Sequence, residues 1–163
     1  MVMKYILYAI LAVLIIFIFL LLASEIYKAW YYKKNPRARL HNLAMRYYAG
    51  VCGMVTRICQ DEGRPYTKEE SIREFFKDIA REHHEIDFSP VWKKKGEYFY
   101  ELLLSHPELR STYPPEFLEV TFKDICSSIE ICPQLFIARM IEHFYGREEA
   151  AKYAYDIITG KLK

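Results

Sequence analysis

The sequence predicts an all-α protein in which one N-terminal transmembrane helix precedes a cytoplasmic domain of about six helices. Two observations lead to this fold class. The residues from Tyr5 to Ala23 form one uncharged apolar run without Gly or Pro. The rest of the sequence places apolar residues at the three- and four-residue spacings of helices, and no stretch alternates as a strand does. We expect two parts, an anchor with its juxtamembrane segment at 1–34 and a soluble helical domain at 36–163.

The apolar run is long enough for a membrane-spanning helix. A bilayer core about 30 Å thick needs about 20 apolar residues in a helix, and a helix satisfies its backbone polar groups internally. The alternatives are a cleaved signal peptide and a helix buried in a soluble core. The apolar region of a signal peptide usually has about 7–15 residues, and the best cleavage position, after Ala23, has the large Leu21 where a small residue belongs. The sequence therefore favours a retained anchor.

Basic and aromatic residues follow the apolar run. We expect the membrane interface to contain Lys28, Trp30, Tyr31, Tyr32, Lys33, Lys34, Arg37 and Arg39. Trp and Tyr concentrate at membrane interfaces, and an excess of Lys and Arg marks the cytoplasmic side. Because only Lys4 and the amino terminus are cationic before the run, we expect the N-terminus outside and the helical domain in the cytoplasm. Setting the topology is the simplest role of these cations, and recognition of anionic lipid is the alternative.

The soluble region opens with a helix that has a wide apolar face. Pro36 favours a helix start, and the pattern extends to about Gln60. One apolar row contains Leu40, Leu43, Tyr47, Val51, Met54 and Ile58, and a second contains Met45, Tyr48, Cys52, Val55 and Cys59. Two rows predict a central helix that is contacted on two sides. Gly50 and Gly53 lie within it, which predicts the close approach of a neighbouring helix.

The remaining helices are bounded by turn and capping signals. Gly63 and Pro65 end the first soluble helix. Thr67 and Glu70 then form a capping-box pattern for a helix that should end near His83-His84. Further helix starts are expected at Ser89-Pro90, with Trp92 on the buried side, and at Pro115, Gln134 and Glu148. Cys132-Pro133 should be a joint, and Gly146 and Gly160 should end the last two helices.

His83, His84 and Asp87 are the densest group of candidate metal ligands. Adjacent histidines on a helix point in different directions, whereas metal-binding pairs on helices usually lie three or four residues apart. His83 and Asp87 have that spacing, but the helix should end there, so a solvated helix end is favoured. The sequence also contains no phosphate-binding loop and no nucleophile motif. We expect no catalytic residue, no bound cofactor and no metal.

The four cysteines are Cys52, Cys59, Cys126 and Cys132. Neither pair has the spacing of a zinc knuckle. In a cytoplasmic domain we expect reduced thiols that behave as small buried apolar groups. In an oxidising compartment two disulfides would be the alternative.

The net charge and the aromatic content limit the kinds of partner that we expect. The net charge of +2 argues against an extended nucleic-acid surface, which needs a clustered basic excess. Aromatic residues make up 16% of the chain and suit a core, a membrane interface or a protein partner. We expect contact with a lipid bilayer and with another protein. The leading hypothesis is a protein-binding adaptor or accessory factor, and the alternatives are a small subunit of a multi-subunit membrane complex, a metal-binding protein or an enzyme.

Two stretches of the soluble region resemble a known domain. The first contains Arg46-Tyr47-Tyr48, Glu62-Gly63-Arg64-Pro65 and Thr67-Lys68-Glu69-Glu70, and the second is Phe144-Tyr145-Gly146-Arg147-Glu148-Glu149-Ala150-Ala151. They resemble the helical domain of unknown function that follows the last membrane helix in membrane-bound transglutaminase-like proteins. Lys68 stands where that family prefers Pro, the first Tyr of its late motif is unmatched, and residues 85–131 do not match. The resemblance implies a cytoplasmic helical domain at a membrane. It transfers no catalytic residue, because the transglutaminase-like triad belongs to a separate domain.

Overall fold

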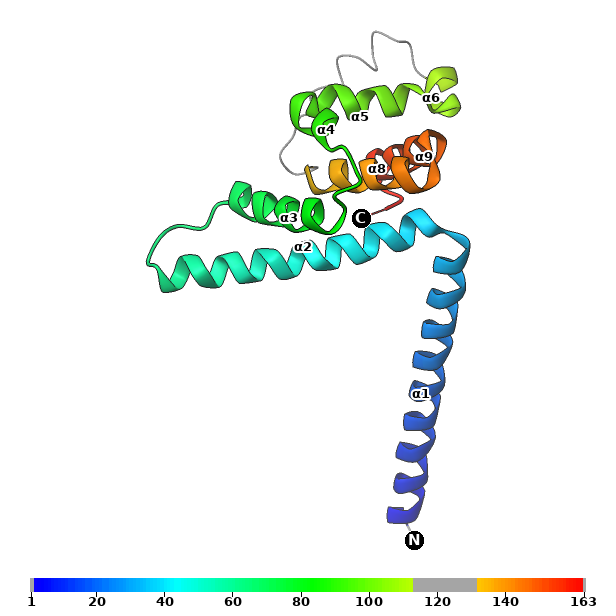
Figure 1. Ribbon diagram of the computed structural model, residues 1–163. Helices are drawn as coiled ribbons and strands as arrows, with labels where there is room; N and C mark the ends of the chain where they lie inside the picture. The colour runs from blue at the N-terminus through cyan, green and yellow to red at the C-terminus, as the bar shows by residue number, and fades with distance from the viewer. Residues whose placement is uncertain (1, 113–131, 163) are drawn as a thin grey trace. The chain divides into compact units, whose positions relative to one another are not determined.

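The computed structural model describes residues 2–112 and 132–162, and every regular element in these ranges is a helix (Figure 1). The all-α fold class is thus confirmed. The chain divides into two compact units, Met1–Arg39 and Leu40–Lys163. The helix predicted to start at Pro115 and the thiol of Cys126 lie outside the described residues.

The first unit is dominated by α1, Val2–Lys34. Its large apolar side chains from Tyr5 to Leu22 are 46–69% exposed on all sides of the helix. Its 33 residues correspond to about 50 Å of helix, more than the hydrocarbon core of a bilayer. By length and composition α1 is therefore able to cross a membrane, with its last turns beyond the core.

One residue, Asn35, separates α1 from α2, Pro36–Asp61. The backbone N–H of Asn35 and its side-chain Nδ2 both donate to the carbonyl oxygen of Tyr31, at 2.9 and 3.0 Å. Pro36 has no N–H to continue this pattern and pre-sets the helical φ angle. The predicted helix start at Pro36 is therefore confirmed, and Asn35 closes the end of α1.

In the second unit, α2 packs antiparallel to α3, Lys68–Glu82. The rings of Tyr48 and Phe75 lie 5.2 Å apart, and further along the pair the Sγ of Cys59 lies 3.7 Å from Oε2 of Glu70. Residue numbers rise along one helix as they fall along the other, as an antiparallel pair requires. The buried face of α2 contains the apolar residues Ala44, Tyr48, Val51, Val55 and Cys59, and the polar His41 near its start.

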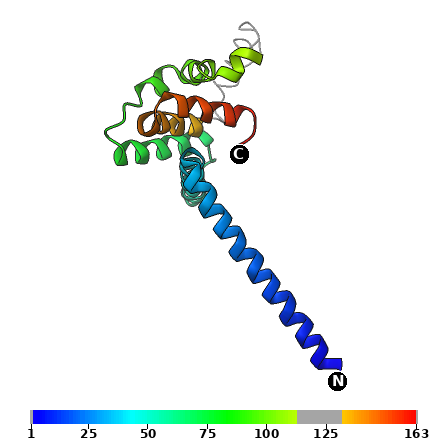
Figure 2. The ribbon, with the colours of Figure 1, turned by 90° about the vertical axis from the view of Figure 1, so that its right-hand side faces the viewer.

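The other core helices are α5, Lys95–Leu104, α8, Cys132–Tyr145, and α9, Arg147–Ile158. Both α8 and α5 contact α9, and Figures 1 and 2 show α5 lying across the α8–α9 pair. Gly146, with φ of 89°, forms the tight connection between α8 and α9, in a conformation that favours glycine. Leu102, Leu135, Ile141 and Ala154 are fully buried where these helices meet.

Helices α3 and α8 run in the same direction. The rings of Phe76 and Phe136 lie 4.9 Å apart, and those of His83 and Phe144 lie 5.6 Å apart. The second contact is two turns further along both helices. The ends of α3 and α8 therefore meet at one place.

Three predicted details differ from the structure. Thr67 precedes α3 as predicted but makes no side-chain capping bond, and the Glu70 carboxylate accepts two bonds from Arg64, of 2.6 and 2.7 Å, instead of reaching back to Thr67. The helix predicted from Ser89 is broken at Lys94 into α4, Ser89–Lys93, and α5. Cys132 begins α8 rather than forming a joint before it.

After Ser105 the chain forms a further short helix, α6, Pro107–Thr112. One prediction about this part of the chain was wrong. Trp92 was predicted to be buried but is 40% exposed, since it covers Phe76 and Phe136 from outside.

A buried polar contact joins the start of α2 to α9. The Nδ1 of His41 and the Oη of Tyr153 lie 2.9 Å apart, across 112 residues of sequence. His41 is 3% exposed and Tyr153 is fully buried. Burial raises the pKa of Tyr153 well above its ordinary value, so the phenol keeps its proton at neutral pH.

A second polar network centres on Glu142 in α8. Its Oε2 accepts from Tyr98 of α5 at 2.9 Å and from Arg139 at 2.7 Å, and its Oε1 lies 3.2 Å from Arg147. The Nε of Arg139 also donates to the backbone oxygen of Asp87, at 2.8 Å. Burial, together with the Glu142 charge, raises the pKa of Tyr98. One carboxylate thus connects α5, α8 and the start of α9.

We expect Tyr153→Phe to destabilise the domain by about 1–2 kcal/mol, because it removes a buried hydrogen bond from His41 without removing the ring. Urea denaturation of the full chain in mild detergent, followed by near-UV circular dichroism, measures the free energy of unfolding. Tyr145→Phe is the matched control, since Tyr145 is 48% exposed, and it should change stability by less than about 0.5 kcal/mol. Equal effects of the two variants would contradict a stabilising His41–Tyr153 contact.

We expect Glu142→Ala to cost about 1–3 kcal/mol, because it leaves the groups of Tyr98 and Arg139 without their shared acceptor. The same denaturation assay applies. Glu148→Ala is the control: it breaks an ion pair of 2.8 Å to Lys152 at a side chain that is 82% exposed. Surface pairs contribute little, so an effect of Glu148→Ala as large as that of Glu142→Ala would overturn the assignment.

Candidate functional site

The C-terminal end of α1 gathers aromatic and basic side chains. The rings of Tyr27 and Trp30 lie 6.2 Å apart, and the Nζ of Lys34 lies 4.4 Å above the centre of the Trp30 ring. Tyr31 contacts both Tyr27 and Tyr32. Trp, Tyr and Lys together are typical of a membrane interface, where the rings are partly apolar and the ammonium groups remain hydrated. Tyr27 completes the cluster and was not among the predicted interface residues.

The ends of α3 and α8 form an exposed cluster of rings, which we call the aromatic patch (His83, His143, Phe144 and Tyr145). The Phe144 ring lies 5.6 Å from that of His83, 5.1 Å from that of His143 and 6.4 Å from that of Tyr145. Phe144 is 46% exposed and Tyr145 48%. Exposed aromatic side chains held by neighbouring rings are typical of the anchors of protein interfaces.

The three candidate metal ligands have other partners. The Nδ1 of His83 lies 3.2 Å from Oε1 of Glu85, and the His84 side chain is 86% exposed. Asp87 accepts from the backbone N–H and the hydroxyl of Ser89, at 2.9 and 3.0 Å. These bonds hold the pKa of Asp87 below its ordinary value. Among the described residues, no three His, Cys, Asp or Glu side chains converge as a metal site requires.

Cys52, Cys59 and Cys132 are thiols. Cys59 and Cys132 belong to the core. Burial raises the pKa of the Cys59 thiol, which keeps it in the protonated, unreactive form. Cys59 and Cys132 therefore act as packing groups in the core, and the half-buried Cys52 packs against it.

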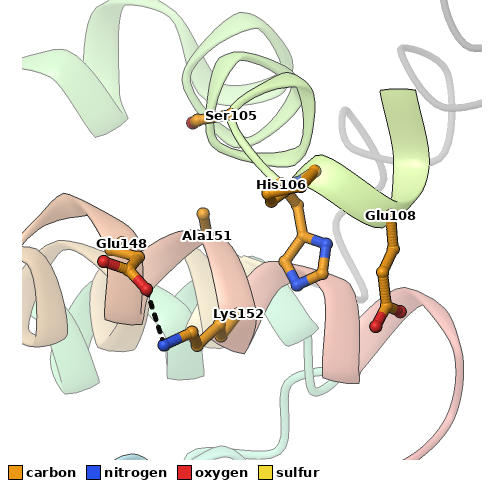
Figure 3. Close-up of a pocket in the computed structure, with 7 residues that line it drawn as sticks. Ser105, His106, Glu108, Glu148, Ala151 and Lys152 are labelled. Atoms are coloured by element: carbon orange, nitrogen blue, oxygen red, sulfur yellow. Dashed lines mark ion pairs between the residues drawn. The ribbon is translucent and has the colours of Figure 1, made fainter. Parts of the chain in front are cut away.

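A pocket of about 330 Å³ lies between the α5–α6 connection and α9 (Figure 3). Ser105 and His106 line one side, and Glu148 and Lys152 line the other. The His106 ring stacks on Tyr155 at 4.4 Å. Lys152 is bonded to Glu148 and Glu149, which raise its pKa and keep it cationic. A lysine held in this way is not a nucleophile, and with Glu148 and Glu108 it gives the described lining of the pocket a mixed charge.

The outer face of α2 carries an apolar row that we call the α2 strip: Leu43, Tyr47, Met54 and Ile58. These side chains are 54, 44, 49 and 41% exposed. A β-carbon added at Gly50 or Gly53 would have no described atom within 4 Å. Within residues 2–112 and 132–162, therefore, only one of the two apolar rows is covered and no helix approaches Gly50 or Gly53, which differs from the prediction. The second row packs against the domain, and Val51 is the buried member of the first.

Comparison with known proteins adds no relative: no protein-family model, no curated protein and no solved structure matches the chain. The resemblance to the helical domain of membrane-bound transglutaminase-like proteins therefore stays a prediction.

We expect Asp87→Asn to lower the midpoint of thermal unfolding at pH 7, since the variant weakens the bonds from Ser89. Because the folded pKa of Asp87 is lowered, its contribution is complete above the ordinary carboxyl pKa and is lost as the pH falls through the folded value. The difference between the variant and the wild type should therefore narrow in acid. The measurement is differential scanning calorimetry of the full chain from pH 7 to pH 3. A zinc-dependent rise in the midpoint that Asp87→Asn abolishes would instead make Asp87 a metal ligand.

Proposed function

We propose that this is a single-pass membrane protein whose helical domain lies in the cytoplasm and binds another protein, as an adaptor or accessory factor. The aromatic patch is the observation that supports binding most directly. It presents Phe144 and Tyr145 to solvent from the junction of α3 and α8, where the core fixes both backbones. Rigid aromatic anchors bind with little loss of conformational entropy.

The anchor and its orientation rest on α1. Its exposed apolar surface is stable only in lipid or against other apolar helices. The cluster of Lys and Arg after the span supports a cytoplasmic domain. The alternative function is that of a small subunit of a larger membrane complex. In that case α1 also contacts neighbouring membrane helices.

The proposal is tested by capturing partners from native membranes with chemical crosslinking, purification of the tagged full chain and quantitative mass spectrometry. We expect Phe144→Ala combined with Tyr145→Ala to reduce recovery of the principal partner at least about tenfold, the loss typical of a pair of interface anchors. Tyr66→Ala is the matched control, because Tyr66 is an aromatic residue 40% exposed elsewhere, and it should leave recovery unchanged.

Thermal unfolding of each variant separates lost binding from lost folding. Recovery of no partner by the wild type, or equal recovery by the double variant, would refute a role of the aromatic patch.

A further inference from the structure

The α2 strip is an apolar surface that the described domain leaves uncovered. Leu43, Tyr47, Met54 and Ile58 follow one another at intervals of four, seven and four residues, so they share one face of the helix. At 1.5 Å per residue the strip is about 22 Å long. Its opposite face is fixed in the core through Tyr48 and Val55, which means that α2 cannot rotate to hide the strip.

Two arginines border the α2 strip on one side. Arg46 and Arg57 are eleven residues apart, three helical turns, and both are exposed. In the described part of the chain neither makes an ion pair. Gly50 and Gly53 lie between them, and the surface there is a shallow groove that also includes Met54 and Ile58. Asp61 lies beyond Ile58, at the last residue of α2, so the cationic edge ends with the strip.

The position of the α2 strip in the chain, shortly after α1, indicates that a membrane covers this surface. Only Asn35 separates α2 from α1, so if α1 crosses a membrane, α2 starts about 16 Å of helix beyond Ala23, the last residue of the apolar run. Leu43 follows the end of α1 by nine residues, about 14 Å of helix. A protein partner would have to be recruited, whereas a lipid surface is already within this reach. An apolar face bordered by arginines, with an amphipathic tyrosine, is the composition of a helix that lies in the headgroup region.

We propose that α2 lies along the membrane surface, with the α2 strip inserted at the boundary of headgroups and acyl chains and with Arg46 and Arg57 bound to the phosphates of anionic lipids. The glycines allow the helix backbone to approach this surface closely, because they add no side chain between Arg46 and Arg57. This inference rests on α1 as the anchor in the proposed function and is independent of the aromatic patch.

The test places a photoreactive benzoylphenylalanine at Met54 of the full chain, in nanodiscs of phosphatidylcholine with or without phosphatidylglycerol. Intact-mass analysis after illumination identifies what Met54 contacts. We expect lipid adducts at Met54. We expect none at the matched position Ala49, which is exposed on the same helix but about 140° away from Met54.

Charge variants test the arginines in the same assay. Arg46→Gln with Arg57→Gln should reduce the adduct yield in phosphatidylglycerol discs about tenfold and remove the dependence on anionic lipid. Arg73→Gln combined with Lys94→Gln removes the same charge from exposed sites outside α2. This control should change neither the adduct yield nor its dependence on anionic lipid.

Other outcomes overturn the proposal. Adducts between two copies would make the α2 strip a dimer interface, and the absence of any adduct would leave it facing water. A protein adduct that forms only in native membranes would assign the strip to a partner. The discs contain no partner, so these results do not bear on the aromatic patch. Extraction of the chain from native membranes by alkaline carbonate would show separately that α1 does not span the membrane.

Discussion

The burial of one face of α2 is the constraint on which the second unit depends. His41 meets Tyr153 near the start of this face, and Tyr48 packs on Phe75 near its middle. These two contacts fix both the position and the rotation of the helix, because they involve α9 and α3 respectively. Everything on the opposite side of α2 must then face outward. The exposure of Leu43 and Met54 follows from the core contacts and does not reflect a loosely packed helix.

The helix boundaries were largely predictable, because single residues with fixed backbone preferences determine them. Pro36 begins α2, and Gly63 and Gly146 end helices with positive φ angles of 65° and 89°. The break at Lys94 was missed, although Gly96 lies two residues beyond it, in the first turn of α5. The capping box did not form: Glu70 had a competing cation in Arg64, and a bidentate ion pair replaced the local bond.

Which apolar surface is covered could not be read from periodicity. Two adjacent rows on α2 have the same spacing, and only the positions of α3 and α9 decide that the Tyr48 row is buried. The aromatic patch has the same origin. His83 stood out in the sequence because of its neighbour His84, but its contact is Phe144, 61 positions away, which depends on α3 and α8 running in the same direction. Long-range packing therefore changes the interpretation of His83 from a solvated helix end to part of a ring cluster.

Helix α3 connects the two surfaces of the domain. The hydroxyl of Tyr47 on the α2 strip donates to Asp78 of α3 at 2.5 Å, and this bond raises the pKa of Tyr47 to about 12. The phenol therefore stays a donor at any physiological pH. Five residues after Asp78, His83 lies in the aromatic patch, at the same end of α3. Helix α3 therefore contacts the α2 strip through Asp78 and the aromatic patch through His83. If the α2 strip binds lipid and the aromatic patch binds a partner, attachment to the membrane also fixes the orientation of the partner-binding surface.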